Sequence, residues 1–331
     1  MKQQPPSDPP SNKSQHWSDV TEKGSSLGMI LLLWFYRYLG RPAFSVVAFF
    51  VIGWFYLSAR VQRQAAQDFQ QRVAQHRLRL GMPEWQPRPF RQFLAFGFSA
   101  LDKISAWAGD IHVNDVDFRN FQTMQQAVGS GQGGVILISH HGNMEICRAI
   151  GQQIPTLKIN AVVHTRNAVK FNQLLQKVAP DAGLNLIEVT SFGPATAVMM
   201  LDKIERGEFI VIVADRTSVQ YRERSLTADF LGVPAYLPEG PFILASILKC
   251  PVYFMACLRG DDNRFLVDFT PYTKRLLLDR KHRQQALANA AQDYAHWLEG
   301  LVLQFPTQWF NFFDFWEKPR PSRDKNPSKT P

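Results

Sequence analysis

The chain has 331 residues, of which 45% are hydrophobic and 20% charged, and its mean hydropathy is −0.19. This length and apolar content exclude a mostly disordered protein, and the mean hydropathy excludes a polytopic transporter. The formal net charge of +9 favours an anionic partner: lipid head groups, an acidic carrier protein or nucleic acid. The three cysteines form no CxxC pair and predict buried, reduced thiols facing a cytosolic pool: Cys147, Cys250 and Cys257.

The N-terminal part predicts a tail, an anchor and a basic helix. Residues 1–26 are rich in Pro, Ser and Gln and predict a disordered tail. Residues 27–59 predict a membrane anchor, because 42–58 are 17 residues without a charge, the lower limit for spanning hydrocarbon. A buried core helix is the alternative. Residues 60–91 carry seven arginines against two acidic residues and predict a basic juxtamembrane helical segment, which places the large C-terminal part in the cytoplasm.

Residues 92–317 have the pattern of one α/β domain, and residues 318–331 predict a disordered basic tail. Short β-rich runs alternate with segments of helical periodicity. This alternation predicts an α/β fold with a mixed, largely parallel sheet and helices on both faces. The expected strands are 135–139, 159–163, 185–189, 209–214, 252–258 and 265–270, and the expected helices are 117–128, 143–153, 167–178, 195–206, 241–248 and 283–303.

The strongest chemical signal is ISHHGNME at residues 138–145, which follows an expected strand and opens an expected helix. Such a turn presents side chains at the carboxyl end of a sheet, where α/β folds bind ligands. His140 can accept a proton from a hydroxyl, and Glu145 can hold the other imidazole nitrogen. Gly142 removes side-chain bulk, and Asn143 is a good N-cap of a helix whose first amides can face an anion. The alternative is a polar loop without chemistry.

This run reads as HX4E and resembles the catalytic motif of the lysophospholipid acyltransferase superfamily. The chain is most similar to the branch that contains the bacterial lipid A acyltransferases, since the anchor, the basic helix, HX4E, GEFIVIVADR (207–216) and PTQWF (306–310) follow in family order. The resemblance implies acyl transfer without a covalent enzyme intermediate, with His140 as general base and Glu145 orienting it. It implies no cofactor or metal.

The same resemblance implies the partners and the location. The donor would be acyl carrier protein or acyl-CoA, and the acceptor a hydroxyl of a lipid or glycolipid. The catalytic domain would face the cytoplasm at the bacterial inner membrane. The run ends in NFFDFW (311–316), whereas lipid A acyltransferases usually carry a basic His/Arg-rich stretch there, so the chain is closer to less characterised members of the branch.

Two further polar clusters follow expected strands, at the same edge of the predicted sheet. His164 and Arg166 follow one strand, and Arg166 is a candidate for binding an anionic group of the acceptor or the thioester oxygen. An ordinary surface arginine is the alternative. Asp215 and Arg216 follow another strand and either line the acceptor pocket or form an internal ion pair. Polar clusters at three strand ends predict a substrate site more convincingly than any one of them.

Two later segments have no catalytic candidate. Residues 230–241 are expected to form a loop and a helix start, and the aromatic run 305–316 a core-packed or membrane-facing segment.

Other functions stay open on the sequence alone. His141 and Glu145 are four residues apart and suit a metal pair in a metal-dependent hydrolase, with His164 or Asp215 as a third ligand, although no HExxH motif is present. The anchor and the charge also fit a non-enzymatic basic membrane-surface scaffold, which leaves the HX4E turn unexplained. Nucleic-acid binding is not expected, because the basic excess lies beside the anchor and no recognition motif occurs.

Overall fold

The computed structural model describes residues 26–107, 109–154, 156–163, 185–188, 193–216 and 224–317. The strands are β1 (Val116–Arg119), β2 (Gly134–Gly142), β3 (Ile159–Val163), β4 (Asn185–Glu188), β5 (Phe209–Val213), β6 (Ser225–Phe230), β7 (Val233–Pro238), β8 (Val252–Arg259) and β9 (Phe265–Thr273). The helices are α1 (Ser26–Ser58), α2 (Arg60–Arg79), α3 (Pro89–Trp107), α4 (Phe121–Gly129), α5 (Met144–Gln152), α7 (Pro194–Glu205), α8 (Gly240–Leu248) and α9 (Arg283–Gln304).

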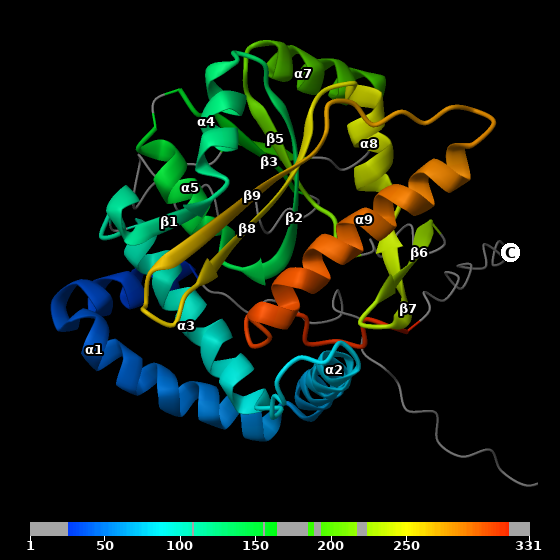
Figure 1. The fold of residues 1–331 in the computed structure, drawn as a ribbon. Coiled ribbons are helices and arrows are strands. Elements are labelled where there is room, and N and C mark those ends of the chain that lie inside the picture. Colours follow the sequence, from blue (N-terminus) through cyan, green and yellow to red (C-terminus); the bar gives the residue numbers. More distant parts are fainter. Residues whose placement is uncertain are drawn as a thin grey trace, which may run out of the picture.

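The strands form a seven-stranded sheet in the order β1-β9-β8-β2-β5-β3-β4 and a separate hairpin, β6-β7 (Figure 1). Neighbouring strands of the large sheet are parallel except β8 and β9. Apolar runs without alternation suit this arrangement, because the sheet is covered on both faces. The predicted mixed, largely parallel α/β sheet is confirmed.

Helices cover both faces of the sheet and create two cores. On β2, Val135 and Leu137 belong to the core shared with α7, α8 and α9, whereas Ile136 and Ile138 belong to the core shared with α4 and α5. Successive residues of a strand point to opposite faces, so one apolar run serves both cores. The predicted buried, free cysteines are confirmed.

Two of the sequence-based assignments are wrong. The helix expected over 117–128 begins only at Phe121, because residues 116–119 pair with β9 as the short edge strand β1. The loop expected from residue 230 lies within the β6-β7 hairpin, whose turn places Leu231 and Gly232 at φ 58° and 72°. The helix expected over 167–178 lies outside the described residues.

The region expected to be a membrane anchor forms α1, which has a non-helical break at Gly40 (φ 73°). Among the described residues, no single helix is long and apolar enough to cross a membrane. Pro42–Ser58 and Arg60–Arg79 meet that criterion only together, with a bend of 91° between them. The second half of α1 packs on α3, with Ile52 and Phe93 buried in a common cluster. The anchor itself stays a prediction.

At Gly142, the last residue of β2, the backbones of β2 and β8 approach each other closely. Its φ is 81°, and a Cβ atom there would lie 1.9 Å from the carbonyl oxygen of Cys257. We expect Gly142→Ala to lower the free energy of unfolding by about 3 kcal/mol or more, measured by chemical denaturation. Gly129→Ala is the control, because a Cβ atom there meets nothing within 4 Å. Equal effects of the two substitutions would contradict this packing.

Candidate functional site

The register of β2 and β5 brings two polar residues together at one edge of the sheet. The strands are parallel, with Ile138 opposite Val213. His140 and Asp215 each follow two residues later, so they leave the sheet side by side. Of the three polar clusters expected at this edge, two meet as predicted, whereas His164 and Arg166 lie outside the described residues.

The strand β2 does not end at residue 139 as expected but continues to Gly142. The extension has a partner, because the chain after α9 runs antiparallel to it. His141 forms an antiparallel bridge with Trp309, and the backbone N–H of Phe310 donates to the carbonyl of His140 at 3.0 Å. The aromatic run of residues 305–316 therefore packs beside the catalytic candidates, and Trp309 is completely buried.

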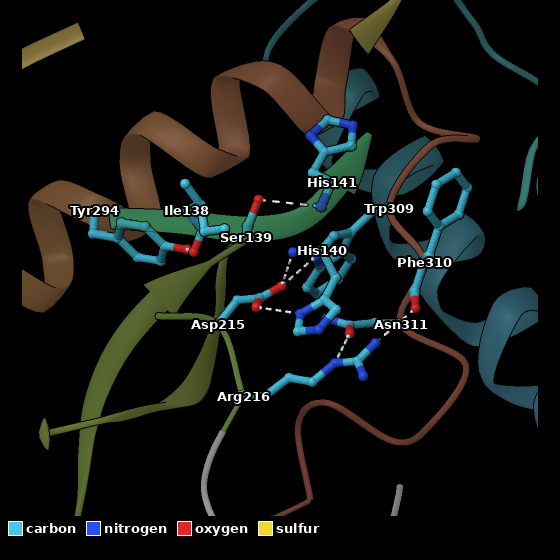
Figure 2. Close-up of polar contacts among 10 residues, drawn as sticks. All are labelled: Ile138, Ser139, His140, His141, Asp215, Arg216, Tyr294, Trp309, Phe310 and Asn311. Carbon is cyan, nitrogen blue, oxygen red and sulfur yellow. Dashed lines mark hydrogen bonds and ion pairs between the residues drawn. The ribbon is translucent and has the colours of Figure 1, made fainter. Parts of the chain in front are cut away.

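His140 and Asp215 form a tight pair (Figure 2). His140 Nδ1 lies 2.7 Å from Asp215 Oδ1. The other carboxylate oxygen, Oδ2, accepts the backbone N–H of His140 at 2.9 Å and the indole N–H of Trp309 at 3.1 Å. The Asp215 side chain is fully buried, but the imidazole of His140 keeps 32% of its surface exposed. The carboxylate is thus shielded from solvent, whereas the imidazole is accessible to it.

The surroundings determine the charge on both members of the pair. Burial alone raises the pKa of Asp215, but His140, Arg216 and the hydrogen bonds outweigh it and lower that pKa to about 2. Burial lowers the pKa of His140 below its ordinary value of 6.5; Asp215 opposes this shift, and Arg216 and Lys103 add to it. At neutral pH, Asp215 is therefore ionised and His140 is neutral.

This charge state fixes the tautomer of His140. An ionised carboxylate only accepts hydrogen bonds, so Nδ1 of His140 carries the proton that faces Asp215. The lone pair is then on Nε2, at the open side of the ring. A neutral histidine whose far nitrogen is held by a buried carboxylate is a competent general base, because the carboxylate stabilises the imidazolium that forms.

Arg216 is held beside this pair by the C-terminal segment. Its Nε donates to Asn311 Oδ1 at 3.0 Å and its Nη2 to the carbonyl of Phe310 at 2.9 Å. The guanidinium also lies 5.5 Å from the ring centroid of Phe313. These contacts keep a positive charge next to His140, where it can stabilise negative charge that develops during a reaction.

Glu145, expected to hold the imidazole of His140, lies in the first turn of α5 and accepts from Arg148 Nε at 2.8 Å. The position at Nδ1 of His140 is taken by Asp215 instead. The HX4E spacing identifies residues close in sequence, whereas this partner comes from the adjacent strand. The orienting role expected of Glu145 is thus filled by Asp215 in this structure, whereas any other role of Glu145 in catalysis and the roles of the substrate-binding residues stay predictions.

The turn before α5 is tightly bonded within the protein. Asn143 is the N-cap of α5, as predicted, and its Oδ1 accepts from the backbone N–H of Glu145 at 3.3 Å. The backbone N–H groups of Gly142 and Asn143 donate to the carbonyls of Gln308 and Cys257. Strand-like contacts therefore satisfy these two amides within the protein. The expectation that the first amides of α5 face an anion stays a prediction.

His141 has a structural environment rather than a catalytic one. It is completely buried, and its Nε2 lies 3.0 Å from the carbonyl of Phe305. Because a carbonyl only accepts, Nε2 carries the proton. No group of three or more His, Cys, Asp or Glu side chains suited to a metal ion occurs within the described ranges. The metal-hydrolase interpretation, which used His141 with Glu145, gains no support from this geometry.

Residues of the C-terminal segment, of α3 and of α9 also contribute to the site, although the sequence did not predict this. Trp309 and Asn311 contact the pair and Arg216, Tyr294 donates to the carbonyl of Ile138 at 2.9 Å, and Lys103 acts on the charge of His140. The aromatic run was visible in the sequence, but its partners come from strands far away along the chain.

Comparison with known proteins adds an independent finding. The family model described as bacterial lipid A biosynthesis acyltransferase matches residues 89–318. This range begins at α3 and includes β2, β5 and the C-terminal segment, so it contains every site residue discussed above. No curated protein matches the chain.

Because His141 is buried, we expect the stability of the protein to depend on pH. Burial lowers its pKa to about 4, so the unfolded chain takes up a proton before the folded protein does as the pH falls from 6.5. Relative to His141→Gln, we expect the wild type to lose about 3 kcal/mol of unfolding free energy between pH 7 and 4. Denaturation at several pH values measures this difference. Parallel pH profiles of the two proteins would contradict a neutral, buried His141.

Proposed function

The chain belongs to the bacterial lipid A biosynthesis acyltransferase family and is an acyltransferase, and we propose that His140 is its general base. The observation that carries the proposal is the geometry of one residue: Nδ1 of His140 is tied to a buried, ionised Asp215, while its imidazole is exposed at the carboxyl end of the sheet. The proposed reaction moves a fatty acyl group from a thioester to a hydroxyl of a lipid or glycolipid.

The proposed reaction needs one base and no covalent enzyme intermediate. Nε2 of His140 takes the proton from the acceptor hydroxyl as its oxygen attacks the thioester carbonyl. The tetrahedral intermediate carries a negative charge on the former carbonyl oxygen. When it collapses, the carbon–sulfur bond breaks and the thiolate receives the proton from the imidazolium. Asp215 stabilises that imidazolium throughout, which lowers the barrier to the first step.

The remaining predicted site residues have supporting roles in this proposal. Arg216, fixed by Asn311, is suited to stabilise the negative oxygen or an anionic group of the acceptor. Glu145 supports the site from the first turn of α5 through its bond with Arg148. His164, Arg166, Gly142 and Asn143 complete the proposed substrate-binding set.

We propose acyl carrier protein as the donor and acyl-CoA as the alternative. Acyl carrier proteins are acidic, and the chain carries a net charge of +9, so association with the carrier would be favoured electrostatically. A thioester-consumption assay with each donor separates the two. Turnover of the acyl carrier protein should also fall as ionic strength rises, because salt weakens the electrostatic steering of an acidic protein.

We further propose that α1 attaches the enzyme to the membrane. Large apolar side chains of its second half are exposed, among them Phe50 at 70% and Trp54 at 75%, while its opposite side packs on α3. An apolar helical face beside basic residues is typical of helices that lie in the membrane interface. Exposed arginines at the start of α2 and around the start of α3 supply that charge: Arg60, Arg88 and Arg91.

In this arrangement the catalytic domain lies on the cytoplasmic side of the bacterial inner membrane. The arginine-rich segment follows the apolar helix directly, and such segments remain cytoplasmic. Anionic lipids of that leaflet attract each basic residue by about 1 kcal/mol. The position suits an enzyme that joins an acyl donor made in the cytoplasm to a lipid.

The pH dependence of kcat/KM distinguishes the roles of the Asp215 and Glu145 carboxylates. Because Asp215 raises the pKa of His140, Asp215→Asn should move the acid limb of kcat/KM to lower pH. It should also reduce kcat by about 10³- to 10⁴-fold, since the imidazolium loses its partner. Glu145→Gln should leave the acid limb in place. Thioester consumption with acyl carrier protein and bacterial lipid measures both.

An acid limb that shifts in Glu145→Gln but not in Asp215→Asn would contradict the proposed pair. His140→Ala controls for background hydrolysis, and the unfolding transition of each variant controls for folding.

Membrane attachment is tested by flotation with vesicles of phosphatidylglycerol and phosphatidylethanolamine. The double variant Phe50→Asp/Trp54→Asp should reduce the vesicle-bound fraction about tenfold or more, because charged groups enter the interface at high cost. Val198→Asp is the matched control, since Val198 is 66% exposed on α7. Equal loss of binding in the two variants, or none in either, would exclude α1 as the attachment surface.

A further inference from the structure

Trp309 occupies an unusual position for a buried tryptophan. It lies on the C-terminal segment, next to His141 across an antiparallel bridge, and is completely buried. Its indole N–H does not bind a backbone carbonyl but donates to Asp215 Oδ2 at 3.1 Å, on the side of the carboxylate away from the imidazole (Figure 2). A residue about 170 positions from the HX4E motif thus contacts the catalytic pair.

The hydrogen bonds of Asp215 divide between its two oxygens. Oδ1 lies 2.7 Å from Nδ1 of His140, while Oδ2 accepts both the backbone N–H of His140 and the indole N–H of Trp309. The two donors on Oδ2 oppose rotation of the carboxylate about its last bond. Rotation would replace a short, charge-assisted bond to the imidazole by a poorer one. The second donor also stabilises the ionised form of a fully buried acid.

We propose that Trp309 is a positioning residue for acyl transfer: its indole N–H fixes the Asp215 carboxylate so that Oδ1 faces His140. The proposal rests on the proposed function of the His140–Asp215 pair and assigns to the C-terminal segment a role in catalysis. Trp309 acts only through Asp215 and touches neither donor nor acceptor.

The ring of Trp309 is itself held firmly. It packs against Phe69 of α2 at 4.9 Å, Phe230 of β6 at 5.2 Å and Phe315 at 4.7 Å between ring centroids. Its carbonyl accepts from the buried Gln92 of α3 at 2.7 Å. A donor anchored from several directions loses little freedom when it binds the carboxylate, which makes it effective in positioning.

Several charged or titratable groups surround the His140–Asp215 pair, and the uncharged indole of Trp309 lies among them. Arg216 and Lys103 disfavour the imidazolium form of His140, Asp215 favours it, and His141 and Tyr294 are neutral groups that also feel Asp215. Without the indole N–H, the carboxylate can turn so that its bond to Nδ1 of His140 becomes poorer. The pKa of His140 should then fall, in the same direction as in Asp215→Asn but by less.

The chain offers a matched control for this bond. Trp297 of α9 donates its indole N–H to Asp268 Oδ1 at 3.2 Å and packs in the same core, but it lies outside the site. Trp309→Phe and Trp297→Phe therefore each remove one indole–carboxylate hydrogen bond and keep an aromatic ring. Incorporating β-(3-benzothienyl)alanine at position 309 removes the N–H while preserving the shape of the indole, in case Trp309→Phe disturbs packing.

The first readout is NMR titration of full-length, detergent-solubilised protein with labelled histidine ring carbons, the His140 signal being assigned with His140→Gln. We expect the pKa of His140 to fall by about 0.5 in both variants of Trp309 and to stay unchanged in Trp297→Phe. The second readout is turnover of palmitoyl-acyl carrier protein with bacterial lipid extract. The kcat should fall about 10- to 100-fold with KM unchanged in the variants of Trp309, and stay unchanged in Trp297→Phe.

An unchanged His140 titration in the folded benzothienyl variant would overturn the proposal. So would an equal loss of kcat in Trp297→Phe, since the effect would then be one of stability alone. If the wild type transfers no acyl group, the proposed function fails, but the titration still decides whether Trp309 controls the pair.

Discussion

The site depends on one buried charge, the carboxylate of Asp215. An ionised carboxylate that is removed from water is costly unless donors surround it. Here the imidazole and backbone of His140 come from β2, and the indole of Trp309 comes from the C-terminal segment. Against the cost of burial, His140 and Arg216 lower the pKa of this acid to about 2, and the indole of Trp309 adds a further hydrogen bond to the ionised carboxylate. The carboxylate therefore connects three segments of the chain, and the charge state of His140 follows from it.

The architecture explains why these segments can meet. Parallel pairing of β2 and β5 aligns the carboxyl ends of two strands that are far apart in the sequence, so His140 and Asp215 lie at the same level. The extension of β2 beyond residue 139 then gives the chain after α9 an edge to pair with. Gly142 permits this extension to pass close to β8. Residues of α3 and α9 complete the surroundings, and α1 packs on α3.

Much of this could be predicted from the sequence, and the exceptions have physical causes. Apolar runs located the main strands, because buried parallel strands are continuously hydrophobic. The polar residues that end those runs identified His140, Asp215 and Arg216. The partner of His140 could not be read from HX4E, because strand register, a long-range property, decides which carboxylate reaches Nδ1. The contact of Trp309 with Asp215 could not be predicted for the same reason. The strand β6, in contrast, has a signal in its sequence, because polar and apolar residues alternate in SLTADF (225–230) as its burial does.

The role of His140 as general base is tested most directly by transfer of a labelled acyl group from acyl carrier protein to bacterial lipid by wild-type protein and by His140→Gln. Mass spectrometry of the lipid fraction identifies the product and its acceptor. We expect an acylated lipid with the wild type and, with folded His140→Gln, only background hydrolysis of the thioester. Undiminished transfer by His140→Gln would contradict this role, because no other residue is assigned to take the proton from the acceptor.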